Sequence, residues 1–187
     1  MAPGRLWEPG GPRPDIYTVG HSTRAFEELA ALLTEFGIEL VADVRSLPRS
    51  RRHPQFNAEE LARWLPPLGI AYRHLPPLGG LRRRGAPDSP NTGWRSAGLR
   101  NYADHMATPE FAQALAELIG LSRQRRTAVM CAEALWWRCH RALISDALSV
   151  AGLAVGHIMG ADQLSPHRLT PFLRLEEGRI IYPAPSA

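Results

Sequence analysis

The sequence contains no lysine, and all 22 of its basic residues are arginine. Without a side-chain amine, the protein cannot form a Schiff base through lysine or bind a phosphate through an ammonium group. Anions must therefore be recognised by arginine, histidine or backbone N–H groups. The formal net charge of +4 and the isoelectric point of about 9.7 favour a polyanionic partner to a modest degree.

Cysteine is also scarce, and long apolar runs are missing. Two cysteines in 187 residues do not make the disulfide framework of a secreted protein, so we expect reduced thiols. No run is long enough to cross a bilayer, and the Pro/Gly-rich start lacks the apolar core of a signal peptide. We expect a cytoplasmic protein without a membrane partner, with a flexible lead over 1–14, one domain over 15–183 and a tail over 184–187.

Short β-rich runs alternate with amphipathic helical segments along the chain. We expect strands over 16–20, 39–45, 70–75, 127–133 and 154–159, helices over 25–37, 58–65, 98–106, 109–121 and 139–152, and a hairpin around Glu177 and Gly178. This alternation predicts an α/β fold, a single three-layer αβα sandwich with a mostly parallel sheet of about five strands.

Three helix starts carry capping residues. Ser22 or Thr23 is placed to cap the first helix, Asn57 the second, and Thr108 the helix that follows it. The stretch 76–96 shows no periodicity, and we expect a long loop there.

Polar side chains gather where the expected strands end. In parallel sheets, ligands bind outside the carboxyl ends of the strands, so these side chains predict one site at that edge. The residues are Gly20, His21 and Ser22 after the first strand, Asp43 and Arg45 at the second, His74 at the third, and Cys131 and Glu133 at the fourth.

The segment "AVMCAEALWWRCHRALI" (128–144) raises the question of a metal site. Cys131 and Cys139 are eight positions apart, unlike the close ligand pairs of zinc sites. Adjacent residues on a helix point about 100° apart, so Cys139 and His140 are not expected to share an ion. A phosphatase loop would need arginine at the position of Trp137. We therefore expect neither a metal, nor another cofactor, nor that phosphatase class.

Two interpretations of Cys131 remain open. Its place at a strand end, near Arg138 and a helix N-terminus, predicts a lowered thiol pKa and a nucleophile or a redox pair with Cys139. The alternative is that each cysteine is a small buried hydrophobic residue.

Asp43 follows three apolar residues and is expected to be buried beside a cationic partner, either Arg45 or Arg141. It is then a general base or electrostatic stabiliser, or one half of a structural ion pair. A basic loop and several tryptophans that could stack on bases together predict a nucleic acid or a nucleotide as partner. They are Arg49, Arg51 and Arg52, and Trp64, Trp94, Trp136 and Trp137.

Six motifs carry a family resemblance: "YTVGHST", "VADVRSLPRSRRHPQFN", "YRHLPPLGG", "YADHM", "MCAEALWWRCHRALI" and "HRLTPF". From Tyr17 to Pro183 the chain resembles the domain of unknown function 488 family. The resemblance implies a single compact αβα domain and a loose association with nucleic-acid metabolism. The site residues it implies are Gly20, His21, Ser22, Asp43, Arg45, Cys131, Glu133, Cys139, His140 and Arg141.

Taken together, these features predict a hydrolase acting on nucleic acid or a nucleotide, of the monofunctional DNA glycosylase type. Asp43 or Glu133 would supply the carboxylate, and the absence of lysine argues against a lyase. One alternative is a thiol-dependent enzyme or redox sensor using Cys131 and Cys139, and another is a non-catalytic nucleotide- or nucleic-acid-binding module. Substrate-binding positions are Gly20, His21, Ser22, Arg45, Trp136, Trp137, Arg138, Cys139, His140 and Arg141, with phosphate contacts at Arg49, Arg51 and Arg52.

Overall fold

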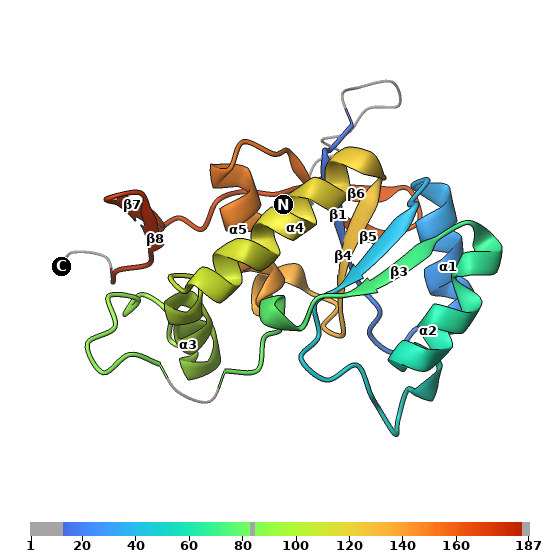
Figure 1. Ribbon diagram of the computed structural model, residues 1–187, viewed down its shortest axis with the longest axis horizontal. Coiled ribbons are helices and arrows are strands. Elements are labelled where there is room, and N and C mark those ends of the chain that lie inside the picture. Colours follow the sequence, from blue (N-terminus) through green and yellow to red (C-terminus); the bar gives the residue numbers. More distant parts are fainter. Residues whose placement is uncertain (1–12, 83–84, 185–187) are drawn as a thin grey trace.

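The computed structural model describes residues 13–82 and 85–184, and within them six strands form one sheet (Figure 1). Their order is β3-β2-β4-β1-β5-β6, and a separate hairpin joins β7 and β8. The predicted lead and tail fall largely outside the described residues, so those boundaries stay predictions. The strands are β1 (Ile16–Gly20), β2 (Leu40–Asp43), β3 (Ala71–His74), β4 (Thr127–Cys131), β5 (Val155–Gly160), β6 (Gln163–Pro166), β7 (Arg174–Glu176) and β8 (Arg179–Ile181).

Helices pack in two apolar clusters around this sheet (Figure 1). One cluster joins α1 (Phe26–Glu35) and α2 (Ala58–Trp64) to Val41 and Met130 of the strands. The other joins α3 (Ala97–His105), α4 (Pro109–Gln124) and α5 (Arg141–Val150) to Ala42 and Val129. The α/β class and the mostly parallel sheet are as predicted, and no described helix is long and apolar enough to cross a membrane.

Both faces of the central strands are covered by helices. Every residue of β1, β2 and β4 is buried. In the parallel register, Gly20 lies beside Cys131 and Asp43 lies beside Met130, which brings the ends of the three strands together.

The sheet has one strand more than the five expected. β6 pairs antiparallel with β5 at the edge of the sheet. Its sequence, "QLSP", has no β-branched or aromatic residue and ends in Pro166, which is tolerated only where a ladder hydrogen bond is not required. The local sequence does not predict this strand, because the strand is stabilised by its pairing with β5.

The predicted capping residue is confirmed for one of the three helices. Thr108 caps α4 by accepting a hydrogen bond from the N–H of Phe111. Neither Ser22 nor Thr23 caps α1, which begins after Ala25, where the carboxylate of Glu28 accepts the Ala25 N–H.

Asn57 precedes α2 as expected, but its side chain does not cap the helix. Its amide oxygen instead accepts the N–H of Ser50 and so holds the β2–α2 loop. In the predicted loop 76–96, the described part contains the short 3-10 helix η3 (Pro76–Leu78) before α3 starts. The hairpin predicted around Glu177 and Gly178 is present as β7–β8.

Candidate functional site

Four parallel strands bring their predicted polar residues to one edge of the sheet, but not into one pocket. Successive strand residues point to opposite faces. Cys131 belongs to the cluster with α5, and so does Ala42, which places the neighbouring side chain of Asp43 on the opposite face. Asp43 and Cys131 therefore belong to two hydrogen-bonded clusters, and Cys131 lies close enough to Arg45 to act on its charge.

The first cluster is a buried ion pair between Asp43 and Arg45. Arg45 donates from Nε to Oδ1 at 2.9 Å, from Nη2 to Oδ2 at 2.6 Å and from its backbone N–H to Oδ1 at 3.0 Å. Tyr72 donates its hydroxyl to Oδ2 at 2.8 Å. Of the two partners considered for Asp43, the structure has Arg45. Asp43 has no exposed surface, and its two oxygens already accept four donors.

His21 belongs to the same cluster. Its ring stacks on Phe56 with centroids 4.2 Å apart, and its Nε2 lies 3.2 Å from a guanidinium nitrogen of Arg45. Burial, with the charge of Arg45, lowers the pKa of His21 to about 4, so the ring is neutral near pH 7. Burial and the carboxylate of Asp43 raise the pKa of Tyr72. These groups support the ion pair and leave Asp43 no approach for a substrate.

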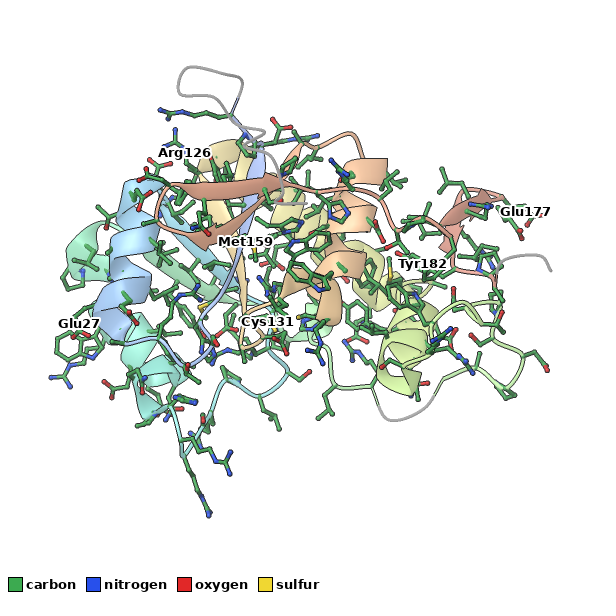
Figure 2. The ribbon with its side chains drawn as sticks, turned by 180° about the vertical axis from the view of Figure 1, so that it is seen from behind. Glu27, Arg126, Cys131, Met159, Glu177 and Tyr182 are labelled. Atoms are coloured by element: carbon green, nitrogen blue, oxygen red, sulfur yellow. The ribbon has the colours of Figure 1, made fainter. Side chains whose placement is uncertain are left out.

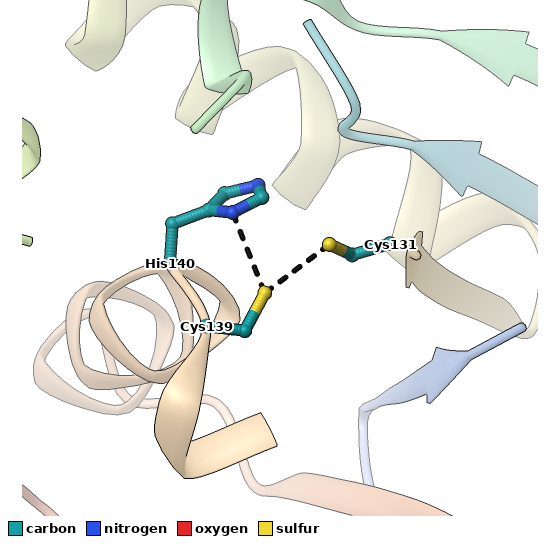
Figure 3. Close-up of side chains that lie close together, drawn as sticks. All are labelled: Cys131, Cys139 and His140. Atoms are coloured by element: carbon teal, nitrogen blue, oxygen red, sulfur yellow. Dashed lines mark hydrogen bonds between the residues drawn. The ribbon is translucent and has the colours of Figure 1, made fainter. Parts of the chain in front are cut away.

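The second cluster is a pair of thiols (Figure 3). Cys131 is the last residue of β4, and Cys139 lies just before α5 in the loop that contains the short 3-10 helix η4 (Trp136–Arg138). Their Sγ atoms are 3.2 Å apart, and both cysteines are free. Only 6% of Cys131 and 5% of Cys139 is exposed, and Figure 2 shows Cys131 in the middle of the molecule.

His140 completes this cluster. Its Nδ1 lies 3.4 Å from Sγ of Cys139, and its Nε2 lies 3.0 Å from the carbonyl oxygen of Val44. A carbonyl can only accept, so Nε2 carries the hydrogen and the lone pair of the neutral ring is on Nδ1, facing the sulfur. Gly80 packs against this ring so closely that a Cβ there would collide with Nδ1.

The geometric argument against a shared metal ion is wrong for this segment. Cys139 has φ −131° and ψ 155°, so it is extended, and the helix begins only after His140. The 100° separation of helical neighbours therefore does not apply. Sγ of Cys131, Sγ of Cys139 and a ring nitrogen of His140 all lie within 4.8 Å of one another.

The two thiols differ in acidity, in the opposite sense to the sequence prediction. A hydrogen bond from Cys131, followed by Arg141, lowers the pKa of Cys139 to about 6 despite its burial. The backbone N–H of Arg141, in the first turn of α5, lies 3.5 Å from this sulfur. The contact with Cys139 and burial raise the pKa of Cys131 to about 12. Cys139, not Cys131, is at the helix N-terminus, and Arg138 is exposed.

The β4–α5 loop is tied down over the end of β1. Arg141 is 1% exposed and donates to the carbonyl groups of Glu133 and Ala134. Gly20 is required here because a Cβ would collide with the carbonyl oxygen of Glu133. Ser22 has a φ of 50°, and its N–H bonds the carbonyl of Ala132. Gly20 and Arg141 thus have packing roles.

The remaining predicted residues of the β4–α5 and β2–α2 loops are exposed, except Trp136, which is half-buried. Glu133 and Arg138 are exposed, and Trp137 is 50% exposed. Trp136 stacks on His157, with centroids 4.0 Å apart and an interplanar angle of 7°. The three arginines predicted to contact phosphates, Arg49, Arg51 and Arg52, are exposed in the β2–α2 loop. Arg49 is paired with Glu59 at 2.8 Å.

A third buried polar cluster was not predicted. Asp146 of α5 accepts from His167 Nε2 at 2.9 Å and from the hydroxyls of Thr170 and Tyr182 at 2.7 and 2.9 Å. His167 Nδ1 lies 3.0 Å from His157 Nε2. Burial lowers the pKa of His157 to about 2. Its sequence signal was the motif "HRLTPF", which contains both His167 and Thr170.

Of the comparisons with known proteins, the one with family models gives a match. A search of the curated proteins and a search of the solved structures found no match. The family model described as "Domain of unknown function DUF488" matches residues 25–148, more than half of the chain, and that range includes Asp43, Arg45, both cysteines and His140. The chain therefore belongs to the DUF488 family.

Proposed function

We propose that the protein is a thiol-dependent redox protein in which Cys139 and Cys131 cycle between two thiols and a disulfide. The observation that carries the proposal is the 3.2 Å separation of two free, buried sulfur atoms. A disulfide needs about 2.0 Å between its sulfurs. Because the thiols already touch, a bond between them requires a small movement of the side chains.

The surroundings of the two sulfurs differ, and this difference supports distinct roles. Cys139 has the N–H of Arg141 at 3.5 Å and the basic nitrogen of His140 at 3.4 Å. The N–H and the charge of Arg141 favour a thiolate, the nucleophilic form of cysteine. The contact with Cys139 and burial raise the pKa of Cys131 although His140 acts in the opposite direction, so Cys131 keeps its proton and suits the second thiol of the pair.

The chemistry balances with a small hydroperoxide as the oxidant. The thiolate of Cys139 attacks the terminal peroxide oxygen, so that an S–O bond forms, the O–O bond breaks, and the leaving alkoxide takes up a proton from water. The sulfur of Cys131 then attacks the sulfenic acid on Cys139, and water leaves with the proton of Cys131. An external thiol reductant returns both cysteines to the reduced form.

The burial of the site supports a small oxidant over a large substrate. Both cysteines are at least 94% buried, and the hollow of about 880 Å³ found in the structure lies elsewhere, between α1 and α2. Its lining includes Phe26, Trp64 and Leu68 but neither cysteine. A peroxide of a few atoms needs only a small opening to reach the sulfurs, whereas a protein disulfide would need them to be exposed.

The test is a titration of the reduced protein with hydrogen peroxide, followed by thiol counting and intact mass. We expect both thiols to be lost together and the mass to fall by two hydrogen atoms. In Cys131→Ser, a sulfenic acid should persist on Cys139 and be trapped by dimedone. In Cys139→Ser, oxidation should be at least about 10-fold slower, since an ordinary thiol is mostly protonated at neutral pH. Free thiols that survive peroxide in the folded wild type would overturn the proposal.

A hydrolase of the DNA glycosylase type is the second candidate, and one observation favours it. Glu133 and Trp137 are exposed within the same β4–α5 loop, so a carboxylate and an aromatic ring are within reach of a flipped base. Arg51 and Arg52 are exposed in another loop and would contact phosphates. In this candidate Glu133 takes the catalytic role, since Asp43 is fully buried and paired with Arg45. Turnover of a damaged-base oligonucleotide that is lost in Glu133→Gln would support it.

A further inference from the structure

We propose that Cys131, Cys139 and His140 bind a thiophilic divalent metal ion, Zn²⁺ above all, in the reduced protein. The donor atoms are two sulfurs and one imidazole nitrogen, all within 4.8 Å of one another (Figure 3). They come from the end of β4 and from the two residues just before α5. Metal binding uses the sulfurs of the proposed redox pair but requires no oxidant, so the two proposals can fail separately.

The distances suit a tetrahedral ion. Zinc bonds of about 2.3 Å to sulfur and 2.0 Å to nitrogen place two sulfurs about 3.8 Å apart and a sulfur about 3.5 Å from the nitrogen. The sulfurs lie 3.2 Å apart, and Cys139 Sγ lies 3.4 Å from His140 Nδ1. A few tenths of an ångström of opening would admit the ion.

The orientation of His140 is that of a metal ligand. Its Nε2–H donates to the carbonyl oxygen of Val44 at 3.0 Å, which leaves the lone pair on Nδ1, directed at the thiols. Ligating histidines in proteins characteristically donate their other N–H to a carbonyl or carboxylate, which fixes the ring and its tautomer. The imidazole is therefore oriented before any ion arrives.

The chemistry of the donors selects the ion. Two sulfurs, a ring nitrogen and no carboxylate favour Zn²⁺ over Mg²⁺ or Ca²⁺, which prefer oxygen. The ion would displace the proton from Cys131, so that two thiolates neutralise its charge. The N–H of Arg141 already lies against Cys139 and would stabilise the bound thiolate. Three protein ligands leave one tetrahedral position for water or another small ligand.

Binding is measured on the full chain, reduced and kept free of oxygen, by competition between the protein and a chromophoric chelator for Zn²⁺. We expect one equivalent of Zn²⁺ per chain. Co²⁺ in its place should give the near-ultraviolet absorption of thiolate-to-cobalt charge transfer, a signature that only sulfur ligation produces. An unfolding temperature that rises with Zn²⁺ would show that the ion binds the folded form.

Variants distinguish this site from adventitious binding. His140→Gln keeps an amide able to donate to Val44 but lacks a donor atom at the Nδ1 position, and Cys139→Ser removes one sulfur. Loss of an outer contact weakens metal sites by about 10- to 100-fold, so loss of a ligand should cost more than about 100-fold. His53→Asn, in the β2–α2 loop, is the matched control and should bind normally.

Three results would overturn the proposal: no Zn²⁺ bound by the reduced wild type, no sulfur charge transfer with Co²⁺, or equal affinity in folded His140→Gln and wild type. Peroxide sensitivity of the metal-free protein is measured separately and concerns only the redox function. A protein that forms the disulfide but binds no Zn²⁺ keeps the proposed function and loses this inference.

Discussion

The surroundings of Asp43 give this side chain a structural role in place of a catalytic one. A fully buried carboxylate is tolerated only when a cation and further donors compensate it, and Arg45 and Tyr72 do so here. The guanidinium of Arg45 also donates to the carbonyl of Phe56 at 2.7 Å, which ties the end of β2 to the loop that follows. The arrangement makes Asp43 an anchor for the backbone.

Replacing Asp43 by Asn should therefore destabilise the protein. The amide keeps the size but leaves the charge of Arg45 buried without its counter-ion, and breaking such pairs costs about 3–5 kcal/mol. Urea unfolding followed by circular dichroism measures the change. Tyr72→Phe, which removes one neutral donor, should cost only about 1 kcal/mol. An Asp43→Asn protein of unchanged stability that had lost an activity would instead favour a catalytic carboxylate.

The loop between β2 and α2 carries exposed arginines that could contact a polyanionic partner. It extends away from the sheet beside α2 (Figure 1), and Arg51 and Arg52 are exposed in it. Arg49 in the same loop is paired with Glu59, which reduces its value for an external phosphate.

If this loop contacts phosphates, oligonucleotide affinity should fall linearly with log salt, and replacing Arg51 and Arg52 by Gln should reduce the slope by up to about 2. All sequences should weaken alike, because phosphate contacts do not read bases. Fluorescence anisotropy over a salt series measures both effects. The matched control is a double replacement of Arg174 and Arg179 in the β7–β8 hairpin. A wild type that retains no oligonucleotide at low salt would end the nucleic-acid hypothesis.

The elements themselves were largely predictable, because their signals are local. The period of the apolar residues, the Thr108 cap and the buried strand runs all act over a few residues, and those elements appear within a few residues of the expected bounds. Strand β6 was missed because its pairing with β5 is a tertiary contact.

The sequence indicated which residues lie at the strand ends, but not how their side chains are arranged there. Parallel strand ends brought Asp43 and Cys131 to one edge, yet the alternation of side chains put them on opposite faces. The arrangement of Cys139 depended on where α5 begins: the helix expected from residue 139 starts at Arg141, two residues later, so Cys139 is extended and its sulfur contacts the N–H of Arg141. Such a boundary cannot be read from sequence to within one residue.

Considered as one folding unit, the protein buries two histidines, His21 and His157, in their neutral form on both sides of the sheet. His21 has a pKa of about 4 and His157 a pKa of about 2 because burial opposes their charge. In the unfolded chain both would titrate near 6.5. As the pH falls below 6.5, these two histidines therefore bind protons in the unfolded state but stay unprotonated in the folded state.

The free energy of unfolding should accordingly be largest above pH 6.5 and fall as the pH drops towards 4. Each of the two histidines contributes up to about 1.4 kcal/mol per pH unit over this window. Urea midpoints at pH 7 and pH 5 measure the loss, and His157→Gln should show a smaller one than the wild type. Equal losses in the two proteins would mean that His157 titrates normally in the fold.

The hydrogen bonds of the cluster around Asp146 form a chain with one donor-to-acceptor direction, and this chain extends to strand β1. Its carboxylate only accepts, so His167 carries a hydrogen on Nε2; in the neutral ring Nδ1 then accepts, and His157 Nε2 has to donate. That leaves Nδ1 of His157 to accept from the hydroxyl of Thr18 at 2.7 Å. Asp146 on α5 thus dictates the tautomer of two rings and the direction of a hydroxyl on β1. Nitrogen-15 chemical shifts of the two imidazoles should report one and the same tautomer, with the hydrogen on Nε2.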